Sequence, residues 1–303
     1  MAASDLAQLA DLKAWLAGSS GIGAGDDPLL ARLITDISGA IYAYLDRPSL
    51  LPRTVTERYD GSGKRRLYLR QFPVISVTTV MVNDVVVPAA AAPTAGGSFP
   101  PIGWLLEPWD GAPPGRAQAL DLFGVWSTGQ GYDAFYHGRQ NVVVTYTTGY
   151  QVVGEAATVP STPGPYVIAP LAPYGPWASD AGVVYANGVP LTAVPGAPSQ
   201  GQYQVVVTNS PDANPPSWGV SYVFSAADAG AAVSISYGFV PAVINNACIE
   251  WAAERYRYRT RIGQSAQTVA GQQTASYSLS GRRAAGMPDF IALSLDPYRM
   301  VTQ

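Results

Sequence analysis

The sequence predicts an α+β protein: a small helical bundle built from both chain ends, with inserted antiparallel β modules and an extended C-terminal arm. Apolar residues recur at helical spacing near both ends of the 303-residue chain. Between the ends, apolar and polar residues alternate, as they do in half-buried strands. The 31 glycines and 26 prolines favour many short strands joined by turns.

Two helices are expected near the N-terminus. The first spans about residues 4–17 and ends at Gly18. The second is capped by Asp26 or Asp27, and Pro28 occupies its first turn, where a missing N–H costs nothing. Its apolar stripe comprises Leu30, Leu33, Ile34, Ile37, Ile41, Tyr44 and Leu45.

Two β regions follow, over residues 53–150 and 151–239. Residues 142–150 resemble residues 233–239, which suggests a duplicated module, although generic strand and turn patterning explains the match equally well. The second region is interpreted as an insertion. Its ends are therefore expected to lie close together, and the helical bundle is expected to need nothing from it.

The helical core is assigned to residues 1–52 and 240–262. Pro241 opens a third helix. The residues expected to form the core of the bundle are Leu30, Ile34, Ile37, Ile41, Ile244, Cys248 and Trp251. Residues 263–303 are predicted to be an arm that ends in a short helix over 288–300.

Composition excludes several classes of protein. Charged residues make up only 13% of the chain. Such a surface is often covered by partners, although Ser, Thr, Asn and Gln could also keep it soluble. The net charge of −3 does not indicate a nucleic-acid binder. A single cysteine excludes an intrachain disulfide. The N-terminus does not resemble a signal peptide, and no stretch reaches the roughly 18 apolar residues of a membrane span. We therefore expect a protein made and used in a cytoplasm, or in a particle assembled there.

No motif indicates catalysis, a cofactor or a metal. The glycine loop at residues 18–23 follows an amphipathic helix, whereas a dinucleotide-binding loop follows a buried strand. Residues 61–64 lack the spacing of a phosphate loop and are interpreted as a hairpin turn. His137 is the only histidine, so a histidine-based metal site is excluded. We expect no enzymatic activity, although a site built from carboxylates alone would leave little trace in a sequence.

The most distinctive local feature is a run of arginines at the end of the third helix, namely Arg255, Arg257, Arg259 and Arg261. They could contact phosphates of passing DNA, or pair with acidic groups of a neighbouring subunit. A third interpretation is a solvated helix end whose arginines complement the helix dipole. Glu254 lies three residues before Arg257, a spacing that allows a local ion pair and favours this third interpretation.

Several segments, taken in order, resemble the head-tail connector proteins of tailed double-stranded DNA phages. The resemblance covers about half of the chain. The segments lie at residues 10–16, 26–34, 44–48, 54–61, 67–75, 237–241, 247–259, 277–279 and 295–299.

The resemblance implies a non-enzymatic homo-oligomeric ring, commonly of twelve subunits. Such a ring lies beneath the portal protein at the head-tail junction of the virion, joins the tail or a tail-terminator or stopper protein, and lets DNA pass without sequence preference. It is assembled in the host cytoplasm. The chain departs from the family in about 90 additional residues before the last helix, so their role is not carried over.

The expected assembly interface comprises Arg255, Arg257, Arg259, Arg261, Tyr277, Leu279, Arg282, Arg283 and Phe290. The alternative hypothesis is a β-rich tail or capsid decoration protein that binds a host receptor and forms no ring.

Overall fold

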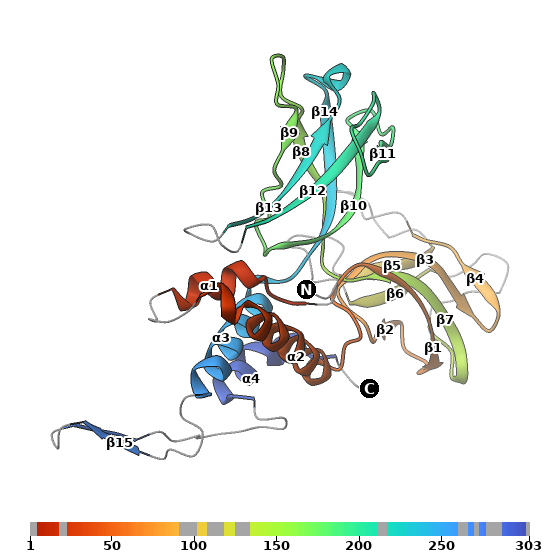
Figure 1. Cartoon of the computed structure of the whole chain (residues 1–303). Coiled ribbons are helices and arrows are strands. Elements are labelled where there is room, and N and C mark those ends of the chain that lie inside the picture. The colour runs from red at the N-terminus through yellow and green to blue at the C-terminus, as the bar shows by residue number, and fades with distance from the viewer. Residues whose placement is uncertain are drawn as a thin grey trace. The chain divides into compact units, whose positions relative to one another are not determined.

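The computed structural model describes residues 5–17, 23–90, 102–107, 118–124, 134–210, 217–259, 266–269, 273–276 and 287–300 (Figure 1). The chain is an α+β protein with 27% helix and 41% strand. Strands thus outweigh helices: the mixed α+β class is confirmed, but the fold is strand-rich and is not a helical bundle with inserted β modules. The physical reason is that the alternating pattern occupies most of the length between residues 53 and 239.

Helices lie near both chain ends and strands lie between them. The α-helices are α1 (Leu9–Leu16), α2 (Asp27–Leu45), α3 (Ala242–Tyr258) and α4 (Asp289–Leu295), and the 3-10 turns are η1 (Ala24–Asp26), η2 (Ala226–Asp228) and η4 (Asp296–Tyr298). The strands are β1 (Arg53–Gly61), β2 (Arg66–Tyr68), β3 (Val74–Val82), β4 (Val85–Val87), β5 (Gly103–Glu107), β6 (Ala119–Phe123), β7 (Gly138–Thr148), β8 (Gln151–Thr158), β9 (Val167–Ile168), β10 (Trp177–Tyr185), β11 (Thr192–Ala193), β12 (Gln202–Ser210), β13 (Ser217–Phe224), β14 (Ala232–Phe239), β15 (Ala266–Val269) and β16 (Gln273–Ser276).

Contacts divide the chain into two compact units. The first unit contains Met1–Pro48, Gly154–Ser236 and Val240–Arg299. The second unit contains Ser49–Val153, Tyr237–Phe239 and Met300–Gln303. The helices and most of the second β region therefore belong to one unit, and the first β region forms the other.

In the first unit, α2 packs against α3, α1 contacts both, and α4 packs on α3. The seven predicted core residues are buried, with at most 3% of each exposed. Helix α1 begins at Leu9, later than predicted, because Gln8 has an extended backbone. Helix α2 ends where Asp46 adopts the left-handed conformation, with φ of 54°.

Buried polar bonds hold the two chain ends together inside this helical cluster. The backbone N–H of Leu6 donates to Ser38 Oγ at 2.9 Å. The side-chain amide of Asn245 donates to the carbonyl of Leu6, also at 2.9 Å. Ser38 Oγ lies 3.6 Å from Cys248 Sγ. These bonds satisfy polar groups that would otherwise be costly to bury.

The second β region contributes two sheets to the first unit, with strand orders β10-β14-β8 and β11-β12-β13-β9. Asp180 of β10 joins them. Its carboxylate accepts the hydroxyl of Tyr203 on β12 at 2.6 Å and that of Tyr222 on β13 at 3.2 Å. The indole N–H of Trp177 donates to the Tyr222 hydroxyl at 3.0 Å. The two sheets therefore share one partly buried polar network.

The ends of the second β region lie close together, as predicted. The N–H of Phe239 donates to the carbonyl of Tyr150 at 3.1 Å, and the two aromatic rings meet edge to face with centroids 5.8 Å apart. Strand β8 leaves from one side of this junction and β14 returns to the other, and both belong to one sheet.

The expected independence of the helices from this region does not hold. The N–H of Ala242, in the first turn of α3, donates to the carbonyl of Tyr174 at 3.0 Å, and Val240 donates to Pro176 at the same distance. Helix α1 also contacts β13. The segment around residues 174–176 thus satisfies backbone donors at the start of α3.

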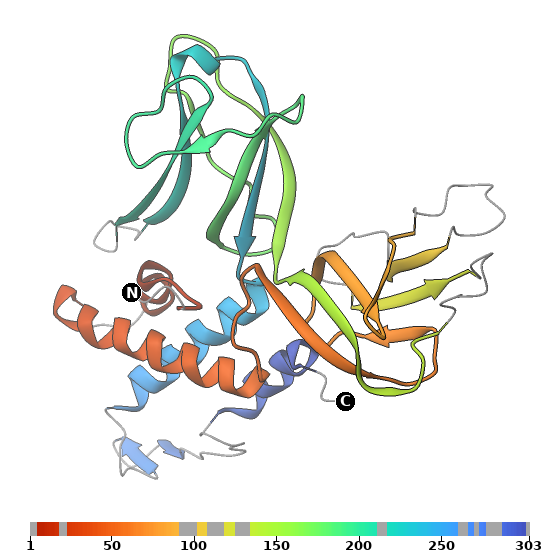
Figure 2. The same cartoon turned by 90° about the vertical axis from the view of Figure 1, so that its right-hand side faces the viewer.

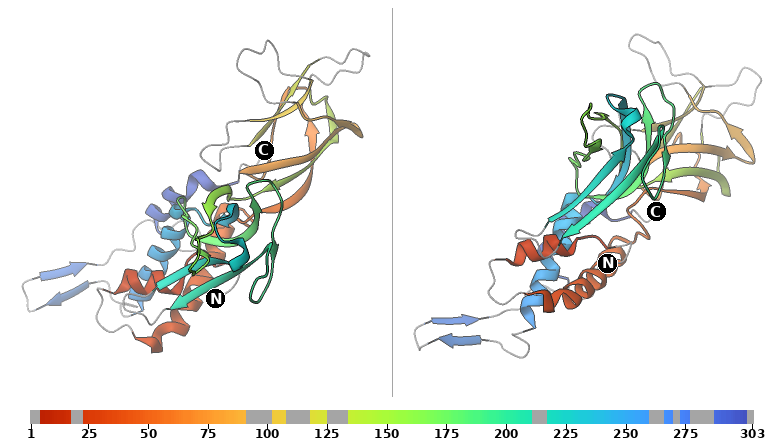
Figure 3. Two further views of the ribbon diagram at one scale, coloured as in Figure 1. Left: turned by 90° about the horizontal axis from the view of Figure 1, so that it is seen from above. Right: turned by 45° about the horizontal axis from the view of Figure 1, so that its top comes forward.

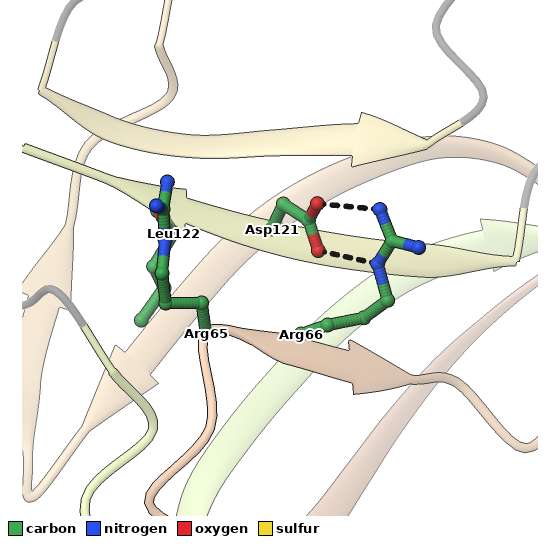
Figure 4. A network of polar contacts seen from close by, with 4 residues as sticks. All are labelled: Arg65, Arg66, Asp121 and Leu122. Atoms are coloured by element: carbon green, nitrogen blue, oxygen red, sulfur yellow. Dashed lines mark hydrogen bonds and ion pairs between the residues drawn. The ribbon is translucent and has the colours of Figure 1, made fainter.

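The second unit contains the antiparallel sheet β1-β7-β3-β4 and the sheet β2-β6-β5. Arginines secure β2 to β6, as Figure 4 shows. The Arg66 guanidinium binds both carboxylate oxygens of Asp121, at 2.7 and 2.6 Å, and Arg65 Nε donates to the carbonyl of Leu122 at 3.0 Å. Paired bonds of this kind are the strongest geometry available to arginine.

A polar network within the second unit is centred on Glu57 of β1. Its carboxylate accepts the hydroxyl of Tyr146 at 2.7 Å, the side-chain amide of Gln71 at 2.8 Å, and the hydroxyl of Tyr59. The tyrosine hydroxyls in turn accept backbone N–H groups, from Arg70 to Tyr59 at 3.0 Å and from Gln71 to Tyr146 at 3.2 Å. The network thereby attaches the chain between β2 and β3 to strands β1 and β7.

Burial by itself would raise the pKa of the Glu57 carboxyl. The hydrogen bonds from Tyr59, Gln71 and Tyr146, together with the charge of Arg70, outweigh burial and lower that pKa below its ordinary value. A lowered pKa in the folded state means that the ionised carboxylate stabilises the fold above the unfolded pKa of about 4.3. This stabilisation is lost as the pH falls through the folded pKa.

The first prediction concerns this network. Replacing Glu57 with Gln should lower the urea midpoint of the second unit at pH 7, because the tyrosine hydroxyls lose a charged acceptor. The deficit should shrink as the pH falls below about 4 and through the lowered pKa of folded Glu57, where wild type also loses the charge. The exposed Glu254→Gln variant is the control with the same change of charge. A deficit that does not depend on pH would contradict the prediction.

The second prediction concerns Gly175, whose φ is +148° and whose hypothetical Cβ would lie 2.0 Å from the carbonyl oxygen of Val240. Gly175→Ala should destabilise the first unit by about 2 kcal/mol or more, because the segment that bonds to the start of α3 must move. Gly182 has φ of +107° but open space around it. The control Gly182→Ala should lose less in the same denaturant titration, and equal losses would show that steric contact is unimportant.

Candidate assembly interface

The C-terminal half of α3 has a buried face and a basic face. Trp251 and Tyr256 are buried, whereas Arg255, Arg257 and Arg259 are exposed. Arginines near the C-terminus of a helix are favoured because they complement its dipole. The guanidinium of Arg255 lies 5.8 Å from the centre of the Trp251 ring, so its stem lies along the helix.

Arg259 pairs within its own chain. Its guanidinium lies 3.0 Å from a carboxylate oxygen of Asp26 in η1. It also stacks 3.9 Å from the ring centre of Tyr256 and donates to the hydroxyl of that residue at 2.8 Å. The start of α2 is thus joined to the end of α3. Sequence reasoning missed Asp26 as the partner, because the two residues are 233 positions apart and no local pattern links them.

This pairing changes the charge behaviour of Asp26. The hydrogen bond from Arg259 is the largest influence and lowers the pKa of the Asp26 carboxyl below its ordinary value. The hydrogen bond from the Tyr256 hydroxyl and the backbone N–H of Gly23 act in the same direction. Arg259 therefore has a structural role at this position.

Helix α4 exposes apolar residues on one side. Phe290 is 55% exposed and Leu293 is 64% exposed, whereas Ile291, Ala292 and Leu295 are buried. Residues three apart lie on one side of a helix, so Phe290 and Leu293 form a continuous apolar pair. Sequence reasoning chose Phe290 and missed Leu293, although its spacing from Phe290 was an available signal.

Contacts with α2 hold α4 in place. The Tyr44 hydroxyl lies 3.4 Å from the carbonyl of Ala292 and donates to the carboxylate of Asp296. The guanidinium of Arg299 lies 5.0 Å from the centre of the Tyr44 ring. The exposed apolar pair is thus presented on a fixed helix, as a protein-binding surface requires.

The other expected interface residues, Arg261, Tyr277, Leu279, Arg282 and Arg283, lie outside the described residues. Within the predicted arm, β15 and β16 form an antiparallel pair (Figure 3), with Ala266 opposite Ser276 and Val269 opposite Gln273. Part of the segment expected to be an extended arm is therefore a two-stranded ribbon.

Of the remaining motifs, the glycine loop at residues 18–23 lies outside the described residues except for Gly23, and residues 61–64 form a turn. Gly63 has φ of +73° and its N–H donates to the carbonyl of Phe135 at 2.7 Å, as expected of a turn and not of a phosphate loop. His137 is exposed, with its ring beside Gly63. Among the residues that the structure describes, no group of three acidic, histidine or cysteine side chains could hold a metal ion. None of the described helices is long and apolar enough to cross a membrane.

No protein-family model matches the sequence, and a search of curated proteins returns no match.

The third prediction concerns the Asp26–Arg259 pair. Arg259→Gln should raise the pKa of the Asp26 carboxyl toward its ordinary value, because the main donor and a nearby positive charge are removed. Measuring the titration of the Asp26 carboxyl carbon by NMR would test this. Arg32→Gln, at an exposed position on α2, serves as the control and should leave the pKa of Asp26 where it is.

Proposed function

We propose that the chain is a structural subunit of a phage head-tail connector, which forms a ring beneath the portal protein and joins the DNA-filled head to the tail. The observation that carries the proposal is the cluster formed by α1, α2, α3 and α4. Helices from opposite ends of the chain share one core there. The order of segments that resembles the connector family runs through these helices.

The surface of this cluster is suited to assembly. The apolar pair on α4 and the arginines on α3 are two chemically different surfaces on one packed unit. In a ring, one surface patch of each subunit meets a different patch of the next. Phe290 and Leu293 supply the apolar contact in this proposal, and Arg255 and Arg257 supply polar contacts to a neighbouring copy or to the portal protein.

The proposed role requires no catalysis. The tail, or a tail-terminator or stopper protein, is the partner on the other side of the ring, and DNA passes through the channel without sequence-specific contacts. The protein is therefore placed at the head-tail junction of the virion, after assembly in the host cytoplasm. The alternative, a β-rich decoration protein that binds a receptor, predicts no ring with a central channel.

The fourth prediction tests this proposal by negative-stain electron microscopy and analytical ultracentrifugation of the purified chain. Wild type should form rings with a central channel. Replacing Phe290 and Leu293 with Ser should raise the concentration needed for assembly more than about tenfold, because each buried side chain contributes roughly 1.5 to 3 kcal/mol. The monomer should remain folded, since both side chains are exposed.

The matched control replaces Leu171 and Val207, which are 79% and 51% exposed, with Ser. Rings formed equally well by both double variants would exclude α4 as the contact. Failure of the wild-type chain to form any ring, even with portal protein present, would exclude the connector itself.

A further inference from the structure

Three turns at one end of the second β region border a hollow of about 580 Å³ that is open to the surface. The turns follow β10, precede β12 and join β13 to β14, and this end lies at the top of Figure 1 and Figure 2. The residues that line the hollow are Tyr185, Ala186, Asn187, Gln200, Ala227, Asp228, Ala229, Gly230, Ala231 and Ala232.

A buried carboxylate holds these turns in position. Asp228 is only 4% exposed. It accepts the hydroxyl of Tyr185 at 2.6 Å and the backbone N–H of Gly201 at 3.2 Å. The N–H of Ala186 donates to the carbonyl of Ala232 at 2.9 Å. The walls of the hollow are therefore fixed before any ligand arrives, which lowers the entropic cost of binding.

The side chains that line the hollow are mostly small. Five alanines and one glycine line it. Gly230 has φ of +77°, and a Cβ added there would meet nothing within 4 Å. A single large side chain at the exposed Ala227 would occupy the space.

The charge of the region restricts the ligand. Residues 151–239 contain no lysine, arginine or histidine, and they include four acidic residues, Glu155, Asp180, Asp212 and Asp228. A phosphate, a sulfated glycan or a nucleic acid would find no counter-charge among these residues, and the one ionisable acid in the lining is Asp228. The charge of the region therefore favours an uncharged ligand.

The polar groups of the lining fit hydroxyl groups. The amides of Asn187 and Gln200, both exposed, each offer a donor and an acceptor. The Asn187 side-chain carbonyl accepts the N–H of Val189 at 3.1 Å. Its NH₂ group has two donors with which it can bind a ligand. Tyr185 adds an aromatic ring, and the alanines add apolar surface. Concave sites of mixed apolar and directed polar groups are typical of small-ligand binding.

We propose that this hollow binds an uncharged saccharide. The hydroxyls of the sugar bond to Asn187 and Gln200, and its C–H surface packs on the Tyr185 ring and the alanines. This site is separate from the helical surface proposed for ring assembly, and its test does not depend on ring formation. A cell-surface polysaccharide and a free oligosaccharide share this chemistry.

The fifth prediction uses surface plasmon resonance with the full chain and immobilised neutral oligosaccharides of glucose, galactose, mannose and N-acetylglucosamine. A sulfated heparin oligosaccharide is the anionic control. At least one neutral sugar should bind, and heparin should not. Ala227→Trp should weaken binding at least about tenfold by filling the hollow. Ala181→Trp, an exposed position on β10 outside the hollow, should bind as wild type does.

A second variant keeps the proposal testable if the Ala227→Trp protein does not fold. Replacing both Asn187 and Gln200 with Ala removes polar groups at exposed positions and should also weaken binding about tenfold. Binding of intact bacterial polysaccharide but not of free oligosaccharides would identify the cell surface as the source. Absence of binding both to every neutral oligosaccharide and to intact neutral polysaccharide, a preference for heparin, or unchanged binding by Ala227→Trp would overturn the proposal.

Discussion

The packing of α2 against α3 is the interaction on which the first unit depends. The two helices come from opposite ends of the chain, and between them they bury Ile34, Ile41, Ile244, Cys248 and Trp251. Closing so long a stretch of chain costs conformational entropy that grows only slowly with its length. A shared apolar core can therefore tolerate large β regions between the helices, and its polar bonds through Ser38 and Asn245 select one alignment.

Tyrosine hydroxyls bonded to a carboxylate recur in both units. Glu57 serves Tyr59 and Tyr146 in the second unit, Asp180 serves Tyr203 and Tyr222 in the first, and Asp228 serves Tyr185 beside the hollow. A chain with 18 tyrosines and few charged residues uses aromatic side chains both as apolar core and as polar links. Burial and these carboxylates raise the pKa of the Tyr59, Tyr146, Tyr203 and Tyr222 hydroxyls, so they stay protonated as donors.

The second β region has two relationships to the rest of the chain. Its two ends meet at a junction between Tyr150 and Phe239. It also supplies the carbonyls that accept the N–H groups of Val240 and Ala242 at the start of α3. The proposed saccharide site lies at the end of the region formed by the turns before β12 and β14, in an acidic environment without cations. Assembly and ligand binding are thus assigned to different parts of the first unit.

The sequence by itself determined the α+β class, the positions of α2 and α3, and the seven residues of the helical core. Periodicity reports which face of a helix or strand is buried, so these predictions needed no partner. The pairing of Asp26 with Arg259, the dependence of α3 on residues 174–176, and the hollow around Asp228 were decided only by the tertiary structure. Each joins residues far apart in the chain, and a polar contact between distant residues leaves no periodic pattern in the sequence.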